Sequence, residues 1–164
     1  MSKHRPANSL SEAVDGRLLA LDIGARRVGV AVSDERQIAV RPLPALRRTN
    51  WKALLQKVTV IIQELDVRGL VIGLPLRLDG TEGDAAHRMR RLARNFALSL
   101  EIPVFLQDER LTTRAAERYL RDSGETGPLA GERLDGVAAA LILSDFIARL
   151  PPREAAAETP RASD

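Results

Sequence analysis

Three acidic residues far apart in this sequence are placed where they could act together: Asp22, Glu109 and Asp135. Asp22 stands where an apolar run stops at Asp-x-Gly, and Glu109 follows a second apolar run. Asp135 is followed by apolar residues at helical spacing, which puts it on the sheet-facing stripe of a predicted helix. If the two apolar runs are parallel strands, all three carboxylates meet at one edge of a sheet.

Carboxylates gathered at one edge repel each other unless a cation lies among them. Hard divalent ions such as Mg²⁺ and Mn²⁺ prefer oxygen ligands. Two such ions, roughly 3.5–4 Å apart, can activate a water and neutralise the leaving oxygen of a phosphodiester. The chain has no cysteine, which excludes a thiol nucleophile and a disulfide framework. We therefore expect Mg²⁺ or Mn²⁺, as two ions, to be the cofactor.

Each acid also has a purely structural explanation. Asp22 precedes Ile-Gly, and Asp and Gly are common in turns. Glu109 neighbours Arg110, with which it could form a surface ion pair of little energetic value. Asp135 lies near the start of a helix, where the macrodipole favours a negative charge. Asp34 and Asp108 are expected to be turn or strand-end residues. The metal site depends on the strand order, which the sequence leaves open.

The elements that would position these acids follow from the apolar pattern. Strands are predicted at residues 17–22 and 28–33, with a third at 37–40 that ends before Pro42 and Pro44. The later elements are a helix from the N-cap Asn50 to residue 65, a strand at 69–73, a helix at 83–100, a strand at 103–107, a helix from Thr112 or Thr113 to about 124, and a helix at 132–149.

This order predicts an α/β fold with a mixed five-stranded sheet. The first three strands are joined by short turns and should be antiparallel, whereas the later strands alternate with helices and should be parallel. Helices are expected on both faces of the sheet. Residues 17–149 form this one domain, residues 1–16 are expected to be a flexible N-terminal tail, and residues 150–164 a disordered C-terminal tail.

The composition restricts the partners. The net charge of +3 and the sequence pI of about 9.9 permit a polyanionic partner. Aromatic residues make up only 3% of the chain, so a nucleic-acid site would rely on charge rather than base stacking. No apolar run approaches the roughly 20 residues of a membrane span, and no secretory signal is evident. We expect a cytoplasmic protein with no membrane partner.

Four segments resemble the motifs of the YqgF (RuvX) family: residues 21–34, 71–83, 108–113 and 135–143. They occur in the family's order and span essentially residues 17–149. The resemblance implies an RNase H-like fold related to the junction resolvase RuvC, and a cytoplasmic nuclease that depends on a divalent metal. The family's acidic positions correspond to Asp22, Glu109 and Asp135 as catalytic and metal-binding residues.

The resemblance also implies a substrate, 16S ribosomal RNA precursor matured at its 5′ end, with pre-ribosomal particles as further candidate partners. Some members of the family are described as Holliday junction resolvases, which would make branched DNA the substrate and require a dimer. The chain could thus be a monomer or a homodimer. A non-catalytic RNA-binding assembly factor is a third interpretation. An actin-like ATPase also contains Asp-x-Gly, but this chain is too short for two lobes.

Four arginines are expected to contact nucleic acid: Arg27, Arg77, Arg110 and Arg114. Arg27 and Arg110 each lie beside an acid, so the alternative for these two is a salt bridge within the site. Gly136, in the first turns of the last helix, is expected to weaken that helix locally and leave the position of Asp135 less defined.

Overall fold

The computed structural model describes residues 14–110, 112–124 and 130–152. Their elements follow the predicted order and are β1 (Arg17–Ile23), β2 (Arg27–Ser33), β3 (Val40–Arg47), α1 (Trp51–Glu64), β4 (Val67–Leu74), α2 (Asp84–Ser99), β5 (Val104–Asp108), α3 (Thr112–Asp122) and α4 (Ala130–Arg149). The boundaries lie within a few residues of those expected, with the exception of β3. No helix in the described ranges is long and apolar enough to cross a membrane.

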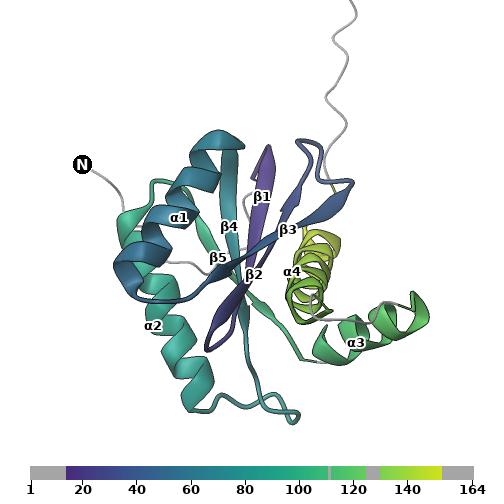
Figure 1. Ribbon diagram of the computed structural model, residues 1–164. Coiled ribbons are helices and arrows are strands. Elements are labelled where there is room, and N and C mark those ends of the chain that lie inside the picture. Colours follow the sequence, from purple (N-terminus) through teal and green to yellow (C-terminus); the bar gives the residue numbers. More distant parts are fainter. Residues whose placement is uncertain (1–13, 111, 125–129, 153–164) are drawn as a thin grey trace, which may run out of the picture.

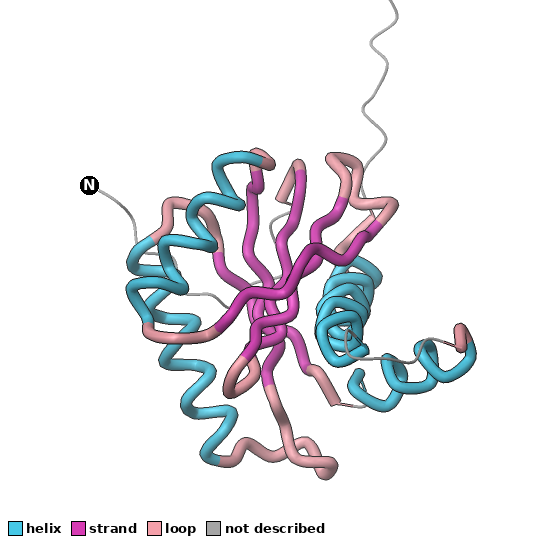
Figure 2. The backbone as a smooth tube through the Cα atoms, in the orientation of Figure 1, coloured by secondary structure: helices cyan, strands magenta, loops and turns pink. Residues whose placement is uncertain are grey.

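The five strands form one mixed sheet in the order β3-β2-β1-β4-β5. The pairs β1–β2 and β2–β3 are antiparallel, and the pairs β1–β4 and β4–β5 are parallel. This confirms the predicted mixed sheet. It also follows that β1, β4 and β5 end at the same edge, toward the bottom of the view in Figures 1 and 2.

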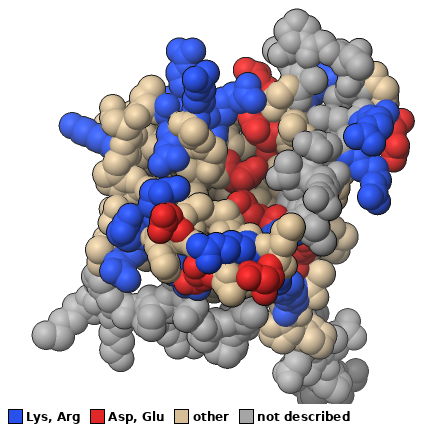
Figure 3. Space-filling model, turned by 90° about the horizontal axis from the view of Figure 1, so that it is seen from below, with Lys and Arg blue, Asp and Glu red and all other residues tan. Residues whose placement is uncertain are grey.

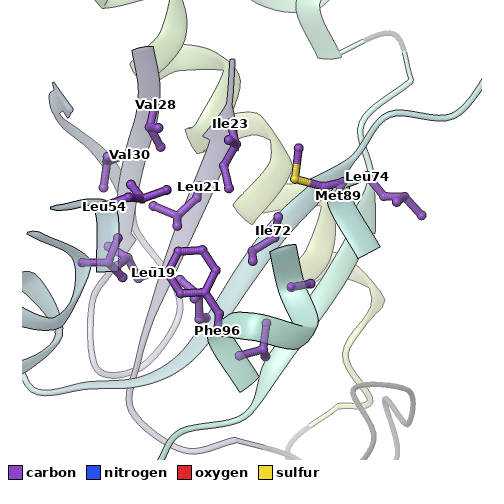
Figure 4. Close-up of a cluster of buried hydrophobic side chains, with 14 of the residues drawn as sticks. Leu19, Leu21, Ile23, Val28, Val30, Leu54, Ile72, Leu74, Met89 and Phe96 are labelled. Carbon is purple, nitrogen blue, oxygen red and sulfur yellow. The ribbon is translucent and has the colours of Figure 1, made fainter. Parts of the chain in front are cut away.

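Helices cover both faces of the sheet, with α1 and α2 on one side and α4 on the other (Figure 1). Alternate residues of β1 divide between two apolar cores because successive side chains of a strand point to opposite faces. Leu19 and Leu21 join the core beneath α1 and α2, part of which is shown in Figure 4. Leu18 and Ala20 join the core beneath α4. Asp22 has the same parity as Leu18 and Ala20 and therefore lies on the α4 side.

The predicted third strand was wrong in its position. It was expected to end before Pro42 and Pro44, but β3 runs through both. The physical reason is that β3 is an edge strand, paired only with β2, where a proline without an N–H is tolerated. Pro42 pairs with Ala31, and Pro44 falls within the irregularity of the β2–β3 register.

Gln37, expected in that strand, lies instead in the turn before it. Its φ of 58° is in the left-handed region, which strands do not use. Its side-chain amide donates to the carbonyls of Val14 and Gly16 at 2.6 and 2.8 Å. Gln37 therefore fixes the chain just before β1 rather than contributing to the sheet.

Candidate active site

Asp22 is the next-to-last residue of β1 and lies in a row of positions that crosses the sheet on the α4 side. In the antiparallel pairing of β1 with β2, Asp22 stands opposite Gly29. On the other side of β1, Gly73 of β4 pairs with Gln107 of β5. The two positions that flank Asp22 in this row thus carry no side chain, which leaves space around its carboxylate.

Glu109 enters this space from the end of β5. Its backbone N–H donates to the carbonyl of Leu74 at 3.2 Å, which extends the β4–β5 pairing by one residue. Its carboxylate lies over Gly73, because a Cβ placed at Gly73 would stand 2.5 Å from Glu109 Oε2. The carboxyl groups of Glu109 and Asp22 are hydrogen-bonded to each other. The structure thus brings together two of the three predicted acids.

The pKa values of both carboxyl groups are raised. Burial, the negative charge of Asp22 and their mutual hydrogen bond raise the pKa of Glu109 to about 8. Burial also raises the pKa of Asp22; the hydrogen bond from Glu109 acts in the opposite direction, and the charge of Asp135 raises it further. Two half-buried carboxyl groups in contact cannot both ionise at low cost unless a cation lies beside them.

Asp135 is positioned by direct contact between α4 and the β2–β3 hairpin. A Cβ at Gly29 would lie 2.1 Å from the main-chain oxygen of Asp135, and a Cβ at Gly136 would lie 3.0 Å from Pro42 Cβ. The absence of side chains at Gly29 and Gly136 therefore lets the helix approach the strands. α4 runs through Gly136, which is buried at this contact, and the local weakening of the helix expected there stays a prediction.

The carboxylate of Asp135 is held by Arg27. Arg27 Nε donates to Asp135 Oδ2 at 2.7 Å. The guanidinium also lies over the first turn of α4, since a Cβ at Gly131 would stand 2.9 Å from Arg27 Nη2. Of the two interpretations of Arg27, the salt bridge within the site is the one that the structure contains.

The donor set suits a hard divalent cation, although it is not arranged as a closed cage. Asp22 and Glu109 are half-buried and offer carboxylate oxygens side by side, which are the ligands that Mg²⁺ and Mn²⁺ favour. Within the described ranges, however, no three His, Asp or Glu side chains are grouped closely enough to hold an ion as they stand. Asp22 and Glu109 bond to each other, and Asp135 bonds to Arg27. Completing a three-acid site requires Asp135 to exchange its partner.

Arg110 also forms a salt bridge, with Asp108. Its Nε and Nη2 approach Asp108 Oδ2 at 2.8 and 2.7 Å, and its N–H donates to Asp108 Oδ1 at 2.9 Å. Burial opposes ionisation of Asp108, but the hydrogen bonds from Arg110 outweigh it and hold the pKa of Asp108 below its ordinary value. Asp108 is thus a strand-end residue, as expected, and it orients Arg110.

Arg110 links the acids to the loop between β4 and α2. Its Nη1 lies 3.5 Å from the carbonyl of Leu78 and packs over Gly80. The loop is further fixed by the bond from the Gly80 N–H to the Arg77 carbonyl at 2.8 Å. Arg77 is exposed, with its guanidinium beside Gly83. Arg114 lies in α3, but its side chain is outside the part of the chain that the structure describes.

Gln107 is a buried polar residue of the site that sequence reasoning missed. It is only 3% exposed and lies two residues before Glu109, on the same face of β5. Its Nε2 donates a long hydrogen bond of 3.4 Å to the carbonyl of Asp108. The period of two in a strand could have indicated that Gln107 faces the acids, but its burial depends on α4, which covers that face.

The surface at this edge is acidic at its centre and basic around it. Figure 3 shows the molecule from below, with Asp and Glu side chains through the middle and Lys and Arg side chains on both sides. A surface of this kind attracts a polyanion to its borders and holds carboxylates at its centre.

Comparison with known proteins gives one family and many relatives. The family model described as "RuvX: Holliday junction resolvase" matches residues 16–149. A relative from Roseiflexus sp. (strain RS-1) is 39% identical over 132 residues, covering 80% of this chain and 94% of its own. One from Koribacter versatilis (strain Ellin345) is 39% identical over 137 residues, covering 84% and 90%. Both are provisionally named pre-16S rRNA nucleases.

Among solved structures, Thermus thermophilus RuvC in complex with a Holliday junction substrate is similar in fold. The TM-score is 0.51 at 13% sequence identity, and the match covers 82% of this chain and 95% of RuvC. At that identity the likeness concerns the fold alone. It shows that the mixed sheet described above is an RNase H-like fold.

Proposed function

The chain belongs to the RuvX family, and from this premise we propose that it is a metal-dependent nuclease that matures the 5′ end of 16S ribosomal RNA precursor in the cytoplasm. The observation that carries the proposal is the half-buried, hydrogen-bonded carboxyl pair of Asp22 and Glu109 at the carboxyl edge of the sheet. The names of the curated relatives support the choice of RNA.

The residues that would hold Mg²⁺ or Mn²⁺ are Asp22, Glu109 and Asp135, with Asp22 at the centre. Asp22 is hydrogen-bonded to Glu109, and the negative charge of Asp135 acts on its carboxyl group. Asp22 is therefore the acid that interacts with both of the others. Divalent ions bound there would activate a water and stabilise the leaving oxygen of a phosphodiester. Glu109 would bind such an ion as a carboxylate, so ion binding would oppose the burial and the charge of Asp22 that raise its pKa.

The proposed path of the nucleic acid follows the basic borders of this face. Lysine and arginine side chains flank the acids on both sides (Figure 3), so phosphates can be held while one of them lies over the carboxylates. Arg77 is exposed beside the site and suits a phosphate contact, whereas Arg110 keeps the loop in place through Leu78. Binding through such contacts should weaken steeply as salt is raised.

A second candidate is resolution of Holliday junctions, which the description of the matching family favours. Cutting a symmetric four-way junction requires two active sites related by a two-fold axis, and hence a dimer. Ribosomal RNA maturation needs only one site per molecule.

The experiment that separates these functions compares two substrates under one condition. The purified chain, with Mn²⁺, is given a precursor RNA that carries the 5′ end of 16S rRNA and, separately, a four-way DNA junction, while light scattering reports its mass. RNA cleavage by a monomer supports the proposal. Symmetric junction cleavage by a dimer, with no RNA cleavage, would replace it with the second candidate. Salt-sensitive RNA binding without cleavage would indicate a non-catalytic assembly factor.

A further inference from the structure

We propose that Arg27 competes with the metal for Asp135, holding this carboxylate away from the site until a divalent cation displaces the guanidinium. Arg27 is then a positioning residue that sets the metal affinity of the site. The inference rests on the proposed function, since it takes Asp135 as a metal ligand, but it concerns a property that metal binding alone can measure.

The contact itself is made by side chains that can move. Arg27 Nε donates to Asp135 Oδ2 at 2.7 Å, and in the described part of the chain this carboxylate is the guanidinium's single hydrogen-bond partner. The Arg27 side chain is 49% exposed, and that of Asp135 is 24% exposed. Ion pairs this open to solvent contribute little to stability, so a divalent cation can displace the arginine at small cost.

The backbone of Asp135, by contrast, is fixed. Its carbonyl rests on Gly29, and the next residue, Gly136, is packed against Pro42. Gly29 stands opposite Asp22 in the β1–β2 register, so the main chain of Asp135 is already beside the acid pair. Moving its carboxylate from Arg27 to a cation at Asp22 and Glu109 therefore needs a change of side-chain rotamers only.

The same geometry explains why three acids that converge on one edge do not form a ready-made metal cage. Asp22 and Glu109 satisfy each other through a hydrogen bond, and Asp135 is satisfied by Arg27. Each of these interactions occupies carboxyl oxygens that would otherwise be available to bind a cation. Removing Arg27 should leave Asp135 free to bind, and should thus raise the affinity for the metal before any nucleic acid is present.

The test is a Mn²⁺ titration of the full chain without nucleic acid, in which electron paramagnetic resonance reports free Mn²⁺. We expect Arg27→Gln to tighten Mn²⁺ binding about two- to fivefold, the range that corresponds to the loss of an exposed ion pair. Arg26→Gln, which removes the same charge from the neighbouring exposed residue, should change it by less than about twofold. In an Asp135→Asn background, Arg27→Gln should have no effect. Circular dichroism confirms that each variant is folded.

Two results would overturn the inference. If Arg27→Gln changes Mn²⁺ affinity no more than Arg26→Gln, or if its effect persists in the Asp135→Asn background, then Arg27 acts as a distant charge and not by holding Asp135. The proposed function survives both results provided that Asp22→Asn still removes Mn²⁺ binding. If the wild-type chain binds no Mn²⁺, the metal-dependent function itself fails, and this inference fails with it.

Discussion

The main-chain oxygen of Asp135 lies directly against Gly29, so close that a Cβ there would stand 2.1 Å from it. This contact joins the last helix to the second strand at the point opposite Asp22. It is the relationship that holds the main chain of Asp135 beside the pair formed by Asp22 and Glu109. A side chain at position 29 would push α4 away from the sheet and carry Asp135 with it.

Gly29→Ala should therefore destabilise the fold. The obstacle is backbone, which cannot rotate aside, so we expect a loss of about 1–3 kcal/mol, as for an overpacked core. Urea unfolding followed by circular dichroism measures it. The matched control is Gly124→Asn: Gly124 has a φ of 71°, which asparagine tolerates, and nothing lies within 4 Å of its Cβ position. Equal midpoints for Gly29→Ala and the wild type would show that α4 is not packed as described.

Gly73→Ala should affect activity more than stability. The atoms in the way are Glu109 Oε2 at 2.5 Å and Ile142 Cδ1 at 2.8 Å, both at the far ends of side chains that can rotate. The fold should accommodate the methyl group, but the Glu109 carboxylate must move away from Asp22. We expect cleavage to fall about 10- to 100-fold, the effect of misplacing a catalytic group by about 1 Å. A stability loss as large as that of Gly29→Ala, with normal cleavage, would contradict this assignment.

The metal-free chain should lose stability as the pH rises. Burial, the charge of Asp22 and their hydrogen bond raise the pKa of Glu109 from 4.5 to about 8. Between these values the folded chain binds more protons than the unfolded chain, so the free energy of unfolding falls with increasing pH. In EDTA, the urea midpoint at pH 6 should exceed that at pH 9.

Glu109→Gln should remove most of that difference, because a glutamine carries no titrating proton. Glu101→Gln, a change at an exposed glutamate, serves as the control and should retain it. A wild-type midpoint that does not fall between pH 6 and pH 9 would contradict the raised pKa of Glu109 in the metal-free fold.

Arg110→Met should loosen the loop between β4 and α2 without unfolding the domain. The change removes the salt bridge to Asp108 and the contact with the Leu78 carbonyl. Because the Arg110 side chain is exposed, the free energy of unfolding should change little. Hydrogen exchange of residues 75–83 should become faster, while that of β4 stays unchanged. Arg77→Met is the matched control, and equal exchange in both variants would argue against an anchoring role for Arg110.

Much of the fold could be predicted because apolar residues recur at helix or strand spacing in its elements, and capping or turn residues mark their ends. Asn50 does accept the Ala53 N–H at 2.9 Å as the N-cap of α1. The predicted convergence of Asp22 and Glu109 followed from two strands that end at one edge, and the parallel pairings of β4 with β1 and β5 confirm that edge. β3 was misplaced because prolines exclude a strand only from the interior of a sheet, and its edge position is a property of the whole topology.

The details of the site were less accessible from sequence. The reason for a glycine at position 29 is evident only once the backbone that packs against it is known. That backbone belongs to Asp135, in another part of the chain. The choice between a phosphate contact and a salt bridge for Arg27 depended on the same packing. Local patterns carry no information about such long-range contacts, so the approach of Asp22 to Glu109 could be predicted, while the salt bridge of Arg27 could not be chosen over a phosphate contact.

The central claim is that Asp22 organises a metal-dependent nuclease site, and Asp22→Ala tests it most directly. Wild type and variant, shown by circular dichroism to be equally folded, are assayed on precursor RNA and on a four-way DNA junction, with and without Mn²⁺. We predict Mn²⁺-dependent cleavage of the RNA by the wild type and no detectable cleavage by Asp22→Ala. Cleavage by purified Asp22→Ala at the wild-type rate would contradict the claim.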